Sequence, residues 1–218
     1  MRGLVWFARA CFVVAAILLT ILHVDPRWGG INPIASMLSE YALRPGWWMW
    51  DSALCLTSLG SVAVTIVLYR QGLLRGWVPV SCLVLWCVSV VMVAVFTKDP
   101  QGGAVTAAGK LHLSATAVSC VSLPLGGWVL GRRYRTHERW RVLARWVRRS
   151  AELSVPFFLP FIVPFAVHVL VGVQRLPALP TGLLERVMVA LQLLLLAVLA
   201  TWASRATPGA PTPVPAVV

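Results

Sequence analysis

Charged residues are scarce in this sequence of 218 residues. Asp, Glu, Lys and Arg together make up 12% of the chain, against about 25% in soluble domains. Apolar residues make up 59% and gather in long uncharged runs. This composition excludes an ordinary soluble domain and predicts an integral membrane protein. The net charge of +12 does not indicate nucleic-acid binding, because the basic residues cluster between the apolar runs.

Motifs of metal and phosphate chemistry are also missing. The sequence has no H-E-x-x-H element, no Asp-rich D-D-x-x-D element and no phosphate-binding glycine loop. Its five cysteines lie inside apolar segments without metal-ligand spacing, and we interpret them as small buried apolar residues. We therefore expect neither a metal nor a cofactor.

Apolar windows of about 20 residues predict an all-α bundle of six transmembrane helices. The predicted spans are 4–24, 47–69, 77–96, 111–131, 153–173 and 183–204. They form a single domain, 1–204, and the Pro-rich tail 205–218 is expected to be disordered. The first span resembles a signal peptide, but it is long and lacks a small-residue cleavage site, which favours a retained helix.

The distribution of Lys and Arg predicts the orientation. Thirteen of these residues lie on the side of the two termini and six on the other side, which predicts cytoplasmic termini in a bacterial cell membrane. The loop 132–152 is strongly basic and has the pattern of an amphipathic helix, with Trp140 and Trp146 expected at the lipid headgroups. Anchoring of the topology explains this loop, and recognition of an anionic lipid is the alternative.

Acidic residues gather on the opposite, outer side. Five of the seven lie there: Asp25, Glu40, Asp51, Asp99 and Glu185. Asp51 lies about one turn inside the second span, and an acid at that depth indicates a functional site unless Arg44 or Lys110 pairs with it. Three of the four histidines, His23, His112 and His168, also belong to the outer side.

Two outer loops carry much of this group. The first, 25–46, turns repeatedly and contains IASMLSEYAL, whose spacing predicts a short helix that lies on the membrane or folds into the bundle mouth as a lid. The second contains Asp99 in a turn-forming Asp-Pro…Gly-Gly context, where an Asx turn or helix cap is the alternative to a chemical role.

Both loops contain elements that resemble a bacterial membrane family, domain of unknown function 998. The elements are Ser39-Glu40-Tyr41, Gly46-Trp47, Phe96 to Asp99, and Gly109 to His112. The resemblance covers about residues 30 to 130, and Thr97-Lys98 stand where many members have Pro-Thr. The chain is also similar to membrane-bound terpene cyclases of the drimentine type from actinomycetes, which implies a substrate with a farnesyl-like chain.

Cyclisation started by protonation needs a protonated acid, a dry apolar cavity and aromatic faces that stabilise a cation. We expect Asp51 or Glu40, hydrogen-bonded to each other or to Asp99, to donate the proton. His112 or a second carboxylate would accept the final proton. Substrate contacts are expected from the remaining outer aromatic and histidine residues and from one mid-span tryptophan: Trp50, Trp47, Trp86, Tyr41, Phe161, Phe165 and His168.

Other functional classes stay open. A proton-coupled transporter of a small molecule or lipid would need polar groups across the membrane, and Gln192 is the only clear midplane example besides hydroxyls. A haem protein needs paired histidines on facing helices, and an accessory protein needs no chemistry at all. The expected partners are a lipophilic prenylated substrate and membrane lipids, without nucleic acid.

Overall fold

The computed structural model describes residues 1–100, 103–171 and 180–206, with residues 161–171 described by their backbone only. These ranges contain α-helices and one short 3-10 helix, η1, but no strand, so the predicted all-α fold is confirmed there. In chain order the elements are α1 (Arg2–Val24), η1 (Leu38–Leu43), α2 (Trp47–Arg70), α3 (Trp77–Val95), α4 (Ala107–Arg133), α5 (Arg141–Val171) and α6 (Thr181–Ala206).

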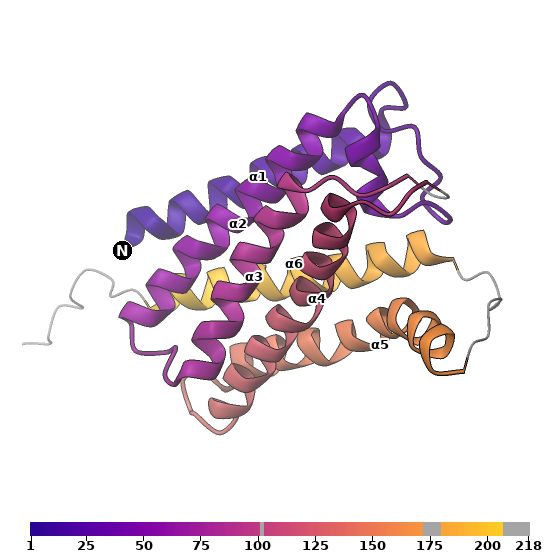
Figure 1. Ribbon diagram of the computed structural model, residues 1–218. Coiled ribbons are helices and arrows are strands. Elements are labelled where there is room, and N and C mark those ends of the chain that lie inside the picture. The colour runs from indigo at the N-terminus through magenta and orange to yellow at the C-terminus, as the bar shows by residue number, and fades with distance from the viewer. Residues whose placement is uncertain (101–102, 172–179, 207–218) are drawn as a thin grey trace, which may run out of the picture.

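Consecutive helices pack side by side along the bundle, as Figure 1 shows for the series from α1 to α5. The last helix, α6, packs mainly on α5 and has only small contacts with α2, α1 and α4. The C-terminal ends of α1 and α3, the N-terminal ends of α2, α4 and α6, and the whole of η1 lie at one end of the bundle, called the η1 end below. This arrangement places residues from most of the chain around one site.

Glycines on α4 allow its neighbours to approach closely. A Cβ on Gly126 would lie 2.9 Å from the Cβ of Cys82 on α3, and one on Gly131 would lie 2.7 Å from the carbonyl oxygen of Ala144 on α5. Side chains at these two positions would push the helices apart. Small residues serve this purpose in helices packed within membranes, where close contact replaces the hydrophobic effect as the source of association.

Five helices, α1, α2, α3, α4 and α6, are long and apolar enough to cross a membrane. Large apolar side chains are exposed along α1, including Trp6, Val13 and Ile17, and a surface of this kind suits lipid rather than water. The predicted membrane helices are thus confirmed for these five. The remaining predicted span, 153–173, overlaps α5 from 153 to 171, and its last two residues lie outside the described ranges.

Two predicted boundaries move by four residues or more. The helix α4 begins four residues early because Thr106 caps it, accepting a 3.0 Å hydrogen bond from the N–H of Gly109. The basic segment does not form a separate helix, since α5 runs without interruption from Arg141. The side chain of Trp140 does not face the outside of the bundle. It is only 7% exposed and packs against Trp202, with ring centroids 6.0 Å apart.

The end of the bundle away from η1 is filled by a packed core. Buried side chains there include Val67 of α2, Leu130 of α4 and Leu199 of α6. Trp202 is fully buried in the same cluster and meets Tyr134 edge to face at 5.4 Å. The described residues therefore close this end tightly, while the η1 end holds a cavity.

Candidate functional site

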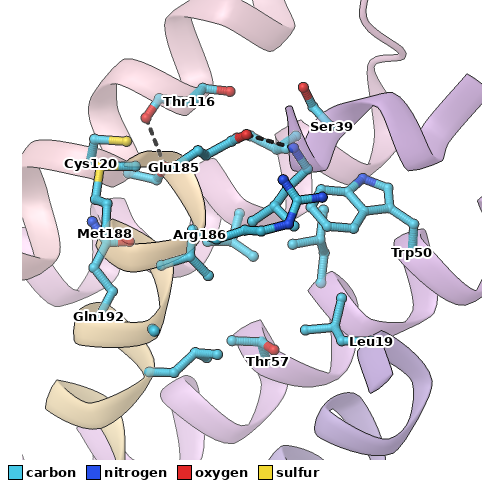
Figure 2. A pocket seen from close by; sticks show the side chains of 18 of the residues that line it. Leu19, Ser39, Trp50, Thr57, Thr116, Cys120, Glu185, Arg186, Met188 and Gln192 are labelled. Carbon is cyan, nitrogen blue, oxygen red and sulfur yellow. Dashed lines mark hydrogen bonds between the residues drawn. The ribbon is translucent and has the colours of Figure 1, made fainter. Parts of the chain in front are cut away.

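A cavity of about 450 Å³ lies at the η1 end. Side chains from α1, η1, α2, α3, α4 and α6 line it, and Figure 2 shows ten of them by name. Its size falls in the range of about 300–1,000 Å³ that is usual for small-molecule sites. Most of its wall is apolar, with Leu54, Val90 and Met188 among the lining residues.

One carboxyl group lines this cavity among the described residues, that of Glu185 in the second turn of α6. Its Oε2 atom accepts a hydrogen bond of 2.5 Å from the backbone N–H of Leu38, the first residue of η1. Burial among apolar groups favours the neutral acid, while this N–H stabilises the carboxylate that remains after proton transfer. The acid is thus held in a fixed position.

Arg186 stands next to the acid and fastens the outer loop. Its Nη1 atom donates to the carbonyl oxygens of Ser36, at 2.7 Å, and of Gly182, at 3.0 Å. Its Nε–H donates to Nε2 of His23 over 3.3 Å. The guanidinium therefore links α6, α1 and the loop before η1, and Figure 2 shows it projecting into the cavity toward Trp50.

Two tryptophans give the cavity aromatic walls. Trp50 of α2 is only 6% exposed and packs on Tyr41 of η1, with ring centroids 6.0 Å apart. Trp86 of α3 lines the wall at a different depth, and its Nε1–H donates to Oγ of Ser61 over 3.2 Å. Both rings are held rigidly, which fixes the positions of their faces relative to a bound ligand.

Three hydrogen-bond donors on the cavity wall are buried and have no partner in the described part of the chain. They are Nε1 of Trp50, Nη2 of Arg186 and Nε2 of Gln192. Buried donors are nearly always paired in folded proteins, because leaving one unpaired costs free energy. All three belong to residues that line the cavity, so its wall carries side chains whose hydrogen-bonding capacity is not used within the protein.

One flank of the cavity is open along the seam between α1 and α6. Five lining residues are exposed, and all belong to these two helices: Ala16, Thr20, His23, Ala190 and Leu193. The small contact between α1 and α6 agrees with such an opening. Both helices are apolar enough to span a membrane, so the surface around the opening suits contact with lipid.

The predicted acids are not brought together in this cavity. Asp51 is partly buried in α2, does not line the cavity, and forms no ion pair with Arg44 or Lys110 in the described ranges. Glu40 lies in η1, where its Oε1 atom accepts the N–H of Met37 at 3.1 Å and so caps that helix. The two residues flank the cavity wall from outside.

Asp99 serves as a cap of the second outer loop. Its carboxylate accepts hydrogen bonds from the N–H of Thr106, at 2.9 Å, and from its hydroxyl, at 2.7 Å. These bonds lower the pKa of the Asp99 carboxyl below its usual value. His112 is buried in α4, where Nδ1–H donates to the carbonyl oxygen of Phe96 at 2.7 Å. Neither residue lines the cavity, so the structure shows the capping alternative for Asp99.

The predicted substrate-binding residues divide into three groups. Trp50 and Trp86 line the cavity. Tyr41 is buried directly behind Trp50, whereas Trp47 is 55% exposed and points away from the bundle interior. The other three lie outside the described side chains: Phe161, Phe165 and His168.

Sequence reasoning gave no site role to Glu185 or Arg186, and it noted Gln192 only as a polar residue at midplane. A usable signal exists, because positions 185, 188, 189 and 192 repeat at helical spacing and all line the cavity. Within the described residues, no three His, Cys, Asp or Glu side chains are close enough to share a metal ion.

A protein-family model described as "Protein of unknown function (DUF998)" matches residues 6–202. The match covers most of the chain, including every described helix in whole or in large part. No curated protein and no solved structure matches the chain.

Proposed function

The chain belongs to the DUF998 family, and on the basis of its cavity we propose that it is a membrane-bound, metal-independent terpene cyclase. In this proposal Glu185 protonates a farnesyl-like prenyl chain and so starts its cyclisation. The observation that carries the proposal is the meeting of one carboxyl group and two tryptophan faces in a single apolar cavity. The resemblance to terpene cyclases of the drimentine type supports the choice of substrate.

The reaction is an isomerisation in which no electrons are exchanged with another reagent. The proton of Glu185 adds to the terminal alkene carbon and leaves a tertiary carbocation. An internal alkene then attacks this cation, a C–C bond forms, and the positive charge moves along the chain. Loss of a proton to a base ends the sequence, so substrate and product have the same formula. The carboxylate of Glu185 is itself within the cavity and can regain the proton.

The aromatic walls stabilise the cation. The faces of Trp50 and Trp86 attract positive charge through the ring quadrupole, and this attraction grows in a desolvated site. The apolar lining also keeps water from quenching the cation. These two properties distinguish the cavity from an ordinary lipid-filled gap, where neither a rigid aromatic face nor an acid is needed.

The seam between α1 and α6 gives a lipophilic substrate a route from the bilayer. We place six spans in the membrane, with α5 as the fifth in chain order and both termini in the cytoplasm, as the charge distribution predicts. In this topology the cavity lies toward the outer leaflet. A prenylated compound dissolved in that leaflet reaches Glu185 without crossing the polar surface.

The test is cyclisation of farnesol by the purified protein in deuterated buffer. We expect a cyclic isomer that carries one solvent-derived deuterium on carbon and no oxygen from water. Glu185→Gln is expected to lower turnover by about 10³-fold or more, since it removes the proton donor. Asp51→Asn is the matched control and should keep most of the activity. The reverse pattern would identify Asp51 as the acid instead.

Transport is the alternative functional class, and the packing of the bundle argues against it. A transporter needs a path through both halves of the bundle, whereas the described side chains form a packed core at the end opposite η1. Uptake of a prenyl compound by proteoliposomes, without any chemical change, would support transport. Product formation in detergent, where no compartment exists, would support the cyclase.

A further inference from the structure

Gln192 is a buried amide that the proposed proton transfer does not use. It is only 4% exposed, it lines the cavity, and its Nε2 atom has no hydrogen-bond partner in the described part of the chain. A primary amide carries two N–H donors and an oxygen that exchange places when the group rotates, so rotation presents a donor to an acceptor on a ligand in the cavity. Thr57 of α2, which also lines the cavity, differs, because its hydroxyl already donates to the carbonyl oxygen of Ala53 at 2.8 Å.

The position of Gln192 relative to Glu185 defines the length of the site. Seven residues separate them on α6, which is two turns or about 10 Å along one helix face. Between them lie the apolar side chains of Met188 and Val189. Figure 2 shows Gln192, Met188 and Glu185 following one another along the same wall. The wall formed by α6 is therefore polar at Glu185 and at Gln192, called the two levels below, and apolar between them.

From this arrangement we infer that the substrate carries an uncharged hydrogen-bond acceptor at the chain end opposite its reacting alkene. Gln192 binds this acceptor and so orients the prenyl chain with the terminal alkene at Glu185. The inference rests on the proposed function and adds a substrate class to it. The class is a prenyl alcohol, ether or carbonyl compound, as opposed to a pure hydrocarbon.

The surroundings of Gln192 explain why the acceptor is uncharged. Leu54, Thr57 and Trp86 also line the cavity and are uncharged, whereas the guanidinium of Arg186 belongs to the Glu185 level, six residues from Gln192 on α6. A diphosphate or carboxylate buried there without a counter-ion would lose its hydration at a large cost in free energy. A neutral oxygen needs only one or two donors, and the amide of Gln192 supplies them.

Binding at both levels also restricts the conformation of the prenyl chain. A span of about 10 Å is shorter than an extended chain of three isoprene units, so a substrate held at Gln192 and Glu185 has to fold between them. Folding brings alkenes close together before protonation and lowers the entropic part of the barrier. Gln192 is thus a positioning residue, which contacts the substrate but not the reacting carbons.

Two probes test the inference: farnesyl methyl ether, which has an acceptor and no donor, and α-farnesene, a hydrocarbon of similar chain length. Their dissociation constants are measured in detergent, in the Glu185→Gln background so that neither is consumed. The ether is expected to bind about tenfold more tightly than the hydrocarbon. Gln192→Met, which keeps the side-chain length, should abolish that preference while leaving hydrocarbon affinity within about twofold.

Thr57→Val is the matched control, since it removes a hydroxyl from the same wall that is already paired, and it should preserve the preference. Gln192→Leu serves in case the Met variant fails to fold. Equal affinity of both probes, or a preference that survives both Gln192 variants, would overturn the inference. Binding and turnover are separate readouts. If a cyclic product forms but the ether is not preferred, the inference on Gln192 is wrong and the cyclase proposal is kept. If the ether is preferred but no product forms, the binding site is supported and the cyclase proposal is wrong.

Discussion

The backbone N–H of Leu38 and the carboxylate of Glu185 are joined by a 2.5 Å hydrogen bond, although 147 residues separate them in the chain. Two further bonds hold the same loop on α6. The N–H of Leu183 donates to the carbonyl oxygen of Ile34 at 3.1 Å, and Nη1 of Arg186 donates to that of Ser36 at 2.7 Å. The outer loop therefore fixes the acid in addition to covering it.

Leu38→Pro removes this donor selectively. Proline is tolerated at the first position of a helix, and the preceding Met37 already has φ −67° and ψ 153°, which suits a residue before proline. A hydrogen bond to a charged group contributes roughly 1.5–3 kcal/mol. We therefore expect the turnover number to fall about tenfold or more, measured as product formation, with a small change in the thermal unfolding midpoint.

Leu38→Ala is the control for that variant, because it loses the same buried side chain but keeps the N–H. Equal turnover in the Pro and Ala variants would show that the bond to Glu185 does not contribute to catalysis.

The seam between α1 and α6 gives a second prediction. Ala190 and Ala16 are exposed and line the cavity from its two sides, so a tryptophan at either position fills the opening. We expect Ala190→Trp and Ala16→Trp to lower kcat/KM for a prenyl substrate at least tenfold in proteoliposomes. Ala10→Trp is the control, since Ala10 is exposed on α1 away from the cavity. Equal rates in all three variants would place substrate entry elsewhere.

The helices were largely predictable, because length and apolarity decide where a chain can span a membrane. The start of α2 at Trp47 agrees with the sequence to the residue. The start of α5 differs from the prediction. The predicted span began at Leu153 because the segment before it is basic. No proline or glycine interrupts helical hydrogen bonding between Arg141 and Val155, so the helix begins at Arg141. Hydropathy indicates whether a segment prefers lipid or water, but it does not indicate whether the backbone of that segment is helical.

The sequence predicted the location of the site correctly, but it did not predict which acidic residue lines the cavity. The gathering of acids and tryptophans pointed to the η1 end, and Trp50 and Trp86 do line the cavity. Asp51 was preferred over Glu185 because it lies deeper in a predicted span and directly follows Trp50. Which face of a helix turns inward depends on its neighbours, and here the loop before α2 folds back onto α6. That contact leaves no trace in local sequence.

Gly182 allows the loop to reach α6, which gives a third prediction. A Cβ at this position would lie 2.3 Å from the carbonyl oxygen of Ser36 and 2.9 Å from that of Ile34. Gly182→Ala is therefore expected to cost about 1–3 kcal/mol through overpacking, seen as a lower unfolding midpoint in detergent. Gly3→Ala is the control, because nothing lies within 4 Å of its Cβ position. If Gly182→Ala is as stable as that control, the loop docks less tightly than the structure shows.

Asp99 provides the last prediction, which separates a structural from a catalytic role. Its pKa is lowered from 3.8 by the hydrogen bonds from Thr106, so the folded state favours the carboxylate. The stability that this charge contributes is full above the unfolded pKa and is lost as the pH falls through the folded one. The unfolding midpoint of Asp99→Asn should therefore lie below that of the wild type at pH 7, and the gap should narrow below about pH 4.

The same variant should retain its cyclase turnover at pH 7, because Asp99 lies outside the cavity and holds the start of α4 through Thr106. Thr106→Val is the control. It also removes the cap on the N–H of Gly109, whose contribution does not titrate, so its lower midpoint should persist at acid pH. Loss of turnover in Asp99→Asn with an unchanged midpoint would instead make this carboxylate part of the chemistry, as the sequence alone had led us to expect.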